Sequence, residues 1–457
     1  MRLREEDVGT ENAVARFVAG TRWEALPGEV RDQARRCLVD SLGATLSGTL
    51  AQVSRITGEF AARTWPGDEA TILLQGRRAG PAGAAFANGW AANAFDTDDG
   101  IRYGYGHAGA QLFPAALAVA ESQDLDGKRL LAGMVVGYEI AHRVGRCWHD
   151  HHEVYQACGS WGSVGCAGAA ANLLELSPEQ AWHALGTAEY FAPNLPMMRD
   201  IDHPAMVKHG IGWGAMTGVM AAGLASGGFT GIPSILAYDS YRQWSDDIGD
   251  HYIMADGVGW KEKGYACCGW AHAAVEGARS LVQTHGLALG EIAAIRVEGF
   301  HETVRLGARL PRTTEEAQFN VAWPVAAMLV DGEIGPAQTI EDRLDDPEIR
   351  SVASRVELVE SEELNELCRL YEIGDPRGRF ASKVTVVLED GRAFDSGLVE
   401  GSFRFPYAPW EREKMEDKFR WLVRHVLDEK RIDQLLDMVW HFEDVPRVRE
   451  LTALVSG

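Results

Sequence analysis

Residues 162–176 read GSVGCAGAAANLLEL, and residues 210–228, GIGWGAMTGVMAAGLASGG, are of the same kind. Glycine and alanine recur in both stretches at intervals of three and four residues, which bring side chains to one face of an α-helix. Small side chains on such a face allow two helix axes to approach closely. The two stretches therefore predict a tightly packed, mostly helical body rather than a parallel sheet.

Helical patterns continue on both sides of these stretches. Residues 29–46 carry apolar side chains at helical spacing, and so do residues 415–439 near the C-terminus. The sequence Ser177-Pro178-Glu179-Gln180 predicts a helix start, with serine as N-cap, proline in the first position and glutamine completing a capping box. We therefore expect helices from the N-terminal region to residue 270 and again from residue 410.

The pattern changes after about residue 280. Residues 292–298 and 383–388 are rich in β-branched side chains, and Glu389-Asp390-Gly391 after the second run is a hairpin signal. Helical patterns lie between the two runs. A chain of 457 residues is expected to form two domains. The prediction is a mainly α protein with an α+β second domain: a discontinuous helical domain, residues 1–270 and 410–457, and an inserted α+β domain, residues 271–409.

Composition limits the partners. The chain has 66 acidic and 44 basic residues, a net charge of −22 that disfavours binding to nucleic acid. No stretch of about 18 uncharged apolar residues predicts a membrane span, and the N-terminus lacks the apolar core of a signal peptide. The seven cysteines show neither zinc-ribbon nor thioredoxin spacing. Reduced thiols and a cytoplasmic location are therefore expected.

The most unusual polar segment follows a helix predicted over residues 83–94. It contains Asp96, Asp98 and Asp99, although acids are disfavoured at a helix C-terminus, and His107 comes shortly after. A calcium loop of the EF-hand type is excluded, because position twelve counted from Asp96 is His107 instead of glutamate. Two interpretations remain: Asp96 orients His107 for acid–base chemistry, or the acids form a solvated loop.

Three further segments could bind a ligand. Lys208-His209-Gly210 begins a glycine-rich helix, and Lys263 to His272 joins the two predicted domains, where pockets are common. Taken singly, a surface lysine and a buried structural segment are the commoner interpretations. The histidines and acids of residues 149–153 suit a polar loop better than a metal site, because only His149 and Glu153 have helical spacing. We find no nucleotide-binding glycine motif and no nucleophile elbow.

The order of these segments resembles the MmgE/PrpD family. The resemblance rests on segments in family order: Phe86-Ala87-Asn88-Gly89 with residues 96–99 and His107, Gly137-Tyr138-Glu139-Ile140 with Arg143-Val144-Gly145, residues 162–176, residues 227–231, Lys263 to His272, and residues 319–332. It implies a homodimer, chemistry without metal or organic cofactor, and a pocket between the helical and α+β domains. The site positions that it implies are Asp96, His107, Lys208 and His272 for catalysis, and Lys263, Arg102, His209, Gln156, Trp323 and Gly100 for substrate binding.

Three of these positions depart from the family pattern. Gly100, Gln156 and Trp323 stand where the pattern has threonine, histidine and tyrosine. These changes remove two hydroxyls and an imidazole from the expected pocket. They argue against cis-aconitate as the substrate and favour a less polar or differently shaped acid.

The resemblance implies a lyase whose substrate is a small carboxylic acid. We expect a dehydratase of a hydroxy-di- or tricarboxylic acid, resembling 2-methylcitrate dehydratase, in which His107, oriented by Asp96, and His272 exchange protons while Lys208 and Lys263 hold carboxylates. A decarboxylase and an epimerase or isomerase are the alternatives within the family. A catalytically degenerate carboxylate-binding protein is the alternative of another class.

Overall fold

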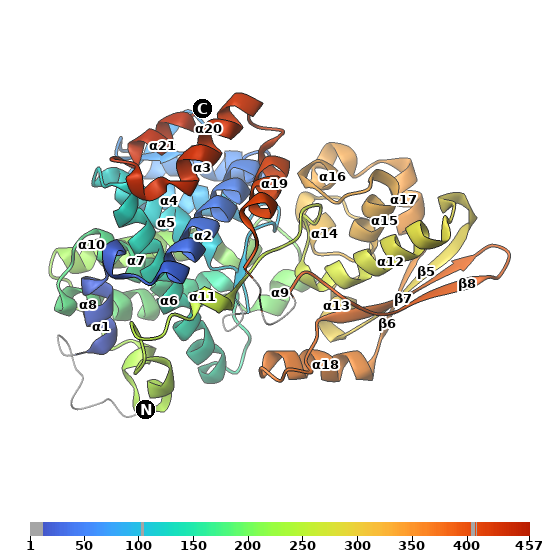
Figure 1. Ribbon diagram of the computed structural model, residues 1–457, viewed down its shortest axis with the longest axis horizontal. Helices are drawn as coiled ribbons and strands as arrows, with labels where there is room; N and C mark the ends of the chain where they lie inside the picture. Colours follow the sequence, from blue (N-terminus) through green and yellow to red (C-terminus); the bar gives the residue numbers. More distant parts are fainter. Residues whose placement is uncertain (1–11, 102–104, 404–406, 408) are drawn as a thin grey trace.

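The computed structural model describes residues 12–101, 105–403, 407 and 409–457. It has two parts that lie side by side, a large helical body and a smaller domain with one four-stranded sheet (Figure 1). The predicted fold class, mainly α with an α+β second domain, is confirmed.

The centre of the body is the glycine- and alanine-rich layer. Helix α7 (Cys158–Leu173) packs between α6 (Gly127–His151) and α10 (Ile211–Ser226). A Cβ atom at Gly218 of α10 would lie 2.4 Å from Cβ of Cys166 on α7, so only glycine permits this approach. The small residues therefore bring the helix axes together, as the sequence predicts.

The remaining body helices surround this layer. The predicted capping box is present at the start of α8, where Ser177 and Gln180 bond each other's backbone N–H groups. Short hairpin strands β1 (Ala70–Ile72) and β2 (Arg77–Ala79) also belong to the body. The surrounding helices are α1 (Ala13–Gly20), α2 (Gly28–Gly48), α3 (Gln52–Thr64), α4 (Pro81–Ala92), α5 (Gly109–Ser122), α8 (Pro178–Tyr190), α9 (Met197–Asp202) and α11 (Met254–Gly257).

The C-terminal helices return to the body. Helix α19 (Arg412–Val423) packs against α2, and α20 (Glu429–Trp440) and α21 (Arg449–Leu454) follow on the same side (Figure 1). The ring of Phe419 would lie 3.0 Å from a Cβ atom at Gly43 of α2. One hydrophobic core therefore contains residues from both the first and the last parts of the chain.

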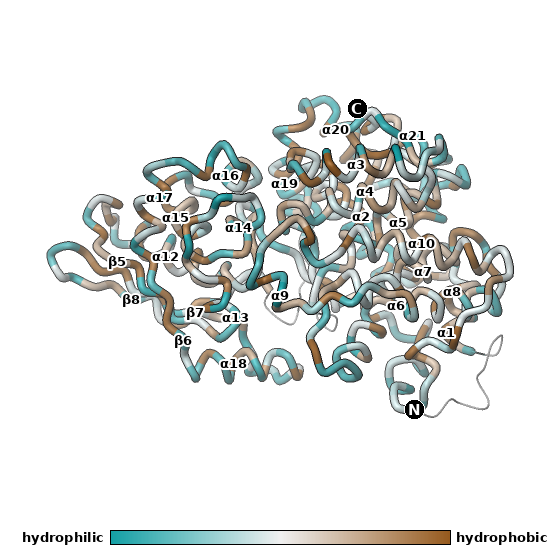
Figure 2. The backbone as a smooth tube through the Cα atoms, turned by 180° about the vertical axis from the view of Figure 1, so that it is seen from behind, coloured by the Kyte–Doolittle hydropathy of each residue, from teal (hydrophilic) through white to brown (hydrophobic). Residues whose placement is uncertain are grey.

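The second domain is built on a mixed sheet. Its strand order is β6 (Val356–Glu360), β5 (Ile292–Gly299), β7 (Ala381–Leu388) and β8 (Ala393–Glu400), with β5 and β6 parallel and the other pairs antiparallel. The predicted hairpin signal lies in the β7–β8 turn, where Gly391 has φ +87°. Hydrophilic segments dominate peripheral elements such as α18 (Glu362–Glu372), as Figure 2 shows.

Helices cover both faces of this sheet. Helix α12 (His272–His285) packs closely, since a Cβ atom at Gly277 would lie 2.7 Å from a methyl group of Val384 on β7. Helix α18 covers the other face with a small core of its own. The remaining helices of the domain are α13 (His301–Leu306), α14 (Thr314–Gln318), α15 (Ala322–Asp331), α16 (Pro336–Thr339) and α17 (Pro347–Ala353).

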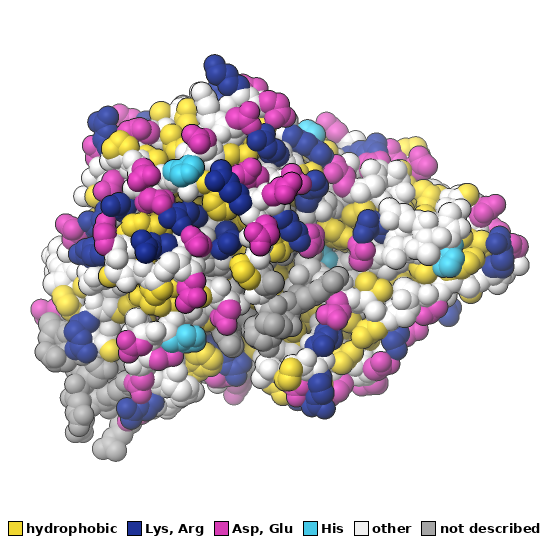
Figure 3. Space-filling model, viewed as in Figure 1, with side chains coloured by type: hydrophobic (Ala, Val, Ile, Leu, Met, Phe, Trp, Pro, Cys, Tyr) yellow, Lys and Arg dark blue, Asp and Glu magenta, His cyan; other side chains and the backbone are white. Residues whose placement is uncertain are grey.

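A short pair of strands lies where the two domains meet. Strand β3 (Gly100–Ile101) follows the aspartate segment and pairs antiparallel with β4 (Val258–Gly259), which precedes the crossing into the α+β domain. The pairing places residues after β4 beside residues before β3. None of the described helices has the length and apolar character needed to cross a membrane. On the face shown in Figure 3, acidic and basic side chains are intermingled.

Candidate functional site

A cavity of about 350 Å³ opens where the two domains meet. The body contributes Gly100, His107 and His209 to its walls, and the α+β domain contributes Trp270 and Phe380. Ligand pockets are common at such junctions. The side chains that gather beneath this cavity form the candidate active site.

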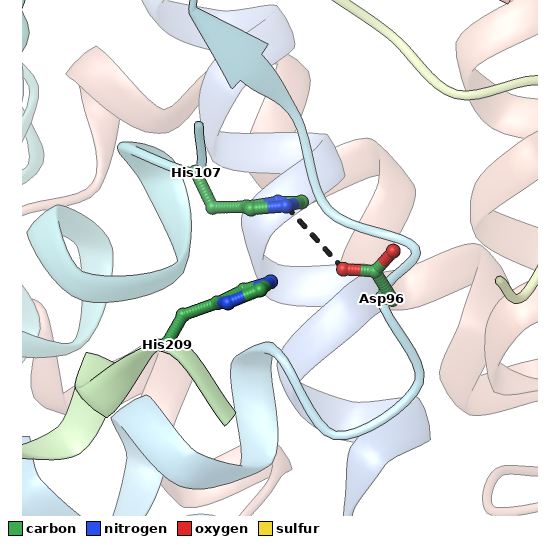
Figure 4. Close-up of side chains that lie close together, drawn as sticks. All are labelled: Asp96, His107 and His209. Carbon is green, nitrogen blue, oxygen red and sulfur yellow. Dashed lines mark ion pairs between the residues drawn. The ribbon is translucent and has the colours of Figure 1, made fainter. Parts of the chain in front are cut away.

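His107 lies between two buried carboxylates. Its Nδ1 is 2.8 Å from Oδ2 of Asp98. Its Nε2 is 3.3 Å from Oδ1 of Asp96, and Figure 4 shows this second pair. Burial alone would lower the pKa of His107, but the charges of Asp98 and Asp96 outweigh burial and raise it. The side chain is 13% exposed and lies at the wall of the cavity, and its raised pKa favours the protonated form.

Asp96 is also paired with Lys261. Nζ of Lys261 donates to Oδ2 of Asp96 at 2.5 Å and also to the Asp96 carbonyl oxygen. Burial would raise the pKa of Asp96, yet Lys261, His107 and nearby cations lower it well below its usual value. Burial would likewise lower the pKa of Lys261, but Asp96 and Asp98 raise it. The pair is therefore charged, although both side chains are only 1% exposed.

The backbone of Asp96 is strained. Its φ of +54° lies in the left-handed region, which is uncommon for a residue with a side chain. Such strain persists where the surroundings hold the residue firmly, and the contacts with Lys261 and His107 do so here.

His209 lies against His107. The two rings are stacked, with centroids 5.3 Å apart and an angle of 16° between them (Figure 4). Its backbone N–H donates to Oδ2 of Asp200 at 2.6 Å, and Nδ1 lies 3.0 Å from the same oxygen. Asp200 thereby orients a second imidazole beside the first, and both line the cavity.

Lys208 lies behind these rings and ties the two domains together. Its buried Nζ donates to the Asn93 carbonyl oxygen at 2.5 Å and to Oε1 of Gln318 on α14 at 2.6 Å. Gln318 donates in turn to the carbonyl oxygen of Ala94. Burial lowers the pKa of Lys208. This lysine does not line the cavity, so it supports the site from the side away from the substrate space.

The third aspartate has a structural role. Asp99 accepts hydrogen bonds from the backbone N–H of Gly109, at 2.9 Å, and from the hydroxyl of Tyr138. Burial, together with the charge of Asp40, raises the pKa of Asp99 to about 7. Lys418 of α19 binds Asp40 and donates to the Thr97 carbonyl oxygen, so the C-terminal helices help to hold the aspartate segment.

Comparison with known proteins gives the family. The model of the MmgE/PrpD N-terminal domain matches residues 12–243, and that of the MmgE/PrpD C-terminal domain matches residues 265–443. The chain belongs to the MmgE/PrpD family.

Its relatives share low identity over nearly the whole length. A cis-aconitate decarboxylase-like protein, oryM, of Aspergillus oryzae is 25% identical over 94% of both chains. Cis-aconitate decarboxylase of Aspergillus terreus is 22% identical over 98% of this chain and 96% of its own. Cis-aconitate decarboxylase of Homo sapiens is 26% identical over 97% of this chain and 94% of its own.

Two residues that the MmgE/PrpD resemblance assigns to the pocket lie elsewhere. Lys263 and His272 line a second cavity of about 390 Å³, and the Lys263 side chain is 55% exposed, 3.8 Å from Asp417. Nδ1 of His272 lies 2.7 Å from Oγ of Ser402, and Nε2 lies 3.0 Å from the Cys267 carbonyl oxygen. Burial lowers the pKa of His272 to about 3. The expectation that His272 and Lys263 line the same cavity as His107 is therefore wrong, because both residues line the second cavity and not the first.

Of the other predicted substrate contacts that the structure describes, Gly100 and His209 line the cavity, whereas Gln156 and Trp323 do not. Gln156 accepts a hydrogen bond from the backbone N–H of Leu195, at 2.7 Å, and holds a loop. Trp323 is fully buried in the α+β core, where Nε1 donates to a backbone carbonyl. The predicted pocket roles of Gln156 and Trp323 are not compatible with these positions. Arg102 lies outside the described residues.

The residue that sequence reasoning missed is Lys261. It stands two positions before Lys263, and the family motif starts at Lys263, so the motif favoured the wrong lysine. The deciding contact is the pairing of β4 with β3, which carries the chain from Gly259 directly past Asp96. In the sequence, the one indication that Lys261 could be the site lysine instead of Lys263 was the presence of both lysines in Lys261-Glu262-Lys263.

Asp96, His107 and His209 could in principle hold a metal ion. One ligand atom from each lies within 4.8 Å of the others, and two imidazoles with a carboxylate suit several divalent metals. However, Lys261 already neutralises Asp96, and the ammonium of Lys208 is also close enough to lower the Asp96 pKa. A divalent cation would be repelled by both lysines, so the arrangement fits proton transfer better. In the described parts of the chain no other such group converges, and this includes residues 149–153.

Proposed function

We propose that this member of the MmgE/PrpD family is a lyase acting on a small carboxylic acid, and that His107 is its general acid. The observation that carries the proposal is the position of His107, between two buried aspartates and at the wall of the cavity. An imidazole kept protonated near neutral pH can deliver a proton to a bound substrate.

The first form of the proposal is a decarboxylase. The bond between the substrate carbon and its carboxylate breaks, carbon dioxide leaves, and the electron pair remains on the substrate. The proton of His107 then forms the new C–H bond, and water restores the proton on the ring. Lys261 supplies a positive charge at the cavity wall that stabilises the developing anion. The relatives named cis-aconitate decarboxylase support this form.

A dehydratase is the second candidate, because a second imidazole stacks on His107. Dehydration requires a base that removes the proton next to the carboxylate and an acid that protonates the leaving hydroxyl. His209, oriented by Asp200, would be the base, and His107 the acid. His209 would then have the proton-transfer role that the family resemblance implied for His272.

Turnover assays separate the possibilities. The purified protein is incubated with saturated, unsaturated and hydroxylated acids, and carbon dioxide, new double bonds and deuterium exchange are measured. Carbon dioxide indicates the decarboxylase and a new double bond the dehydratase, whereas exchange without net change indicates an epimerase or isomerase. Binding without conversion of any acid indicates a carboxylate-binding protein and overturns the lyase.

The role of His107 is tested in the same assay. His107→Asn is expected to lower kcat by about 10²- to 10⁴-fold, the range of general acid catalysis. His441→Asn, in which an exposed histidine of the body is changed, is the matched control and should retain full turnover. Unchanged turnover in His107→Asn would remove this residue from the mechanism.

A further inference from the structure

Aromatic side chains form much of the cavity above His107. Tyr105, Tyr155, Trp270, Tyr371 and Phe380 all line it. The rings of Tyr371 and Phe380 are in close contact, with centroids 4.0 Å apart. The hydroxyl of Tyr155 donates to the carbonyl oxygen of Tyr105 at 2.7 Å, which fixes another part of the wall. Aromatic faces therefore make up a large part of the wall of the substrate space.

The ring of Phe403 forms another part of the cavity wall and packs directly against three glycines. A Cβ atom at Gly100 or at Gly269 would be 2.8 Å from its ring, and one at Gly259 would be 3.1 Å from it. A threonine at position 100, as in the family pattern, would clash with this ring. The glycine at position 100 thus exchanges a hydroxyl in the pocket for a phenyl face.

The charges around the cavity disfavour a polyanion. Among the described lining residues Lys261 is the one ammonium group, and protonated His107 adds a second positive charge; the buried carboxylates of Asp96 and Asp98 balance these two charges. Glu153 and Glu302 also line the cavity, together with Glu372, whose pKa burial raises to about 7. A ligand with three carboxylates would place its negative charges beside these acids, in a space where water screens poorly.

We infer that the natural substrate is a monocarboxylic acid with a planar apolar body, of the aryl- or alkenyl-substituted class, rather than a tricarboxylic acid. Its carboxylate lies near Lys261, His107 and His209, and its body packs on Phe403 and the neighbouring rings. The inference rests on the proposed function only in placing the reacting group beside His107.

A matched pair of probes tests the inference. Cinnamate and trans-aconitate are both substituted propenoic acids, but cinnamate carries a phenyl ring where trans-aconitate carries further carboxylates. Dissociation constants are measured by calorimetry with the full-length protein. We expect cinnamate to bind at least about tenfold more tightly, the effect of one well-packed ring. Equal or tighter binding of trans-aconitate would overturn the inference.

Variants of Phe403 and of the lining glutamates test which side chains cause the difference in affinity between the two probes. Phe403→Leu should weaken cinnamate binding about tenfold and leave trans-aconitate binding unchanged, because leucine keeps an apolar side chain but removes the ring face. Phe229→Ala, which changes an exposed ring on the body, is the control and should change neither constant. The double variant Glu302→Gln with Glu372→Gln should strengthen trans-aconitate binding several-fold. Loss of both ligands in Phe403→Leu, with an unchanged unfolding temperature, would contradict selective ring packing.

Different results would refute the lyase activity and the inferred ligand class. Binding of cinnamate without conversion of any acid would overturn the lyase and leave the inferred ligand class intact. Conversion of a tricarboxylic acid that binds more tightly than cinnamate would overturn the ligand class and leave the lyase intact.

Discussion

Replacing Lys261 with methionine tests the buried charge network beneath the cavity. Nζ of Lys261 is 2.5 Å from Oδ2 of Asp96, and each side chain is 1% exposed. Methionine fills similar space but leaves the carboxylate of Asp96 buried without its main partner. Removing one member of a buried ion pair costs about 3–5 kcal/mol of unfolding free energy. We expect a loss of that size for Lys261→Met.

The double variant Lys261→Met with Asp96→Asn should recover part of this loss, because no unpaired charge remains. Replacing both members of a buried pair by neutral groups is often close to neutral. Urea unfolding of the wild type, both single variants and the double variant gives the coupling free energy, expected at about 1–3 kcal/mol. Lys263→Met is the control, since a half-exposed lysine should change the unfolding free energy by less than about 0.5 kcal/mol.

Additive effects of the two single variants would refute this reasoning. So would a loss in Lys261→Met no larger than in Lys263→Met, because the buried pair would then contribute nothing beyond a surface lysine. A titration of His107 by NMR gives an independent check. Lys261 lowers the pKa of His107, so Lys261→Met should raise it further.

Three other changes follow from the pKa shifts. Asp98→Asn removes a charge that raises the pKa of His107, so the fall in kcat at high pH, where the general acid loses its proton, should move to lower pH in a pH–rate profile. His272 has a pKa of about 3, so between pH 6.5 and 3 the unfolded state binds a proton that the folded state does not. The wild type therefore loses stability as the pH falls through this range, and His272→Asn should lose less. If the unfolding temperatures of the two proteins fall equally with pH, this prediction is contradicted. Asp99 has a pKa of about 7 in the folded protein, whereas an aspartate of the unfolded chain loses its proton near pH 4. Between these two pH values the folded state binds one proton more than the unfolded state, so the unfolding free energy falls as the pH rises toward 7. Asp99→Asn lacks this titration, so its unfolding free energy minus that of the wild type should rise between pH 5 and pH 8 in urea titrations. A difference that stays constant over this range would exclude the raised pKa of Asp99.

The fold class could be predicted from the sequence because its main signals are local. Glycine and alanine periodicity marks the close helix contacts, such as that at Gly218, and the hairpin turn at Gly391 is marked by its own residues. These features depend on neighbours in the chain or on one helix face. They therefore remain visible without knowledge of the tertiary contacts.

The site could be predicted only in part. The aspartate segment and His107 come together because few residues separate them. The choice between Lys261 and Lys263 depends on a strand pairing between residues more than 150 positions apart, which no local pattern contains. His272 was assigned to the wrong cavity for the same reason, since its partner Ser402 comes from the far end of the α+β domain in the sequence.

Both connections between the domains pass along the cavity. The first contributes Lys261, Cys268 and Gly269 to its lining, and the second contributes Phe403 and Tyr407. The residues that join the two domains and those that line the cavity are therefore in part the same. A substitution at Phe403 that changes the shape of the cavity also changes one of the links between the domains, so substrate preference and domain arrangement cannot be altered independently at this position.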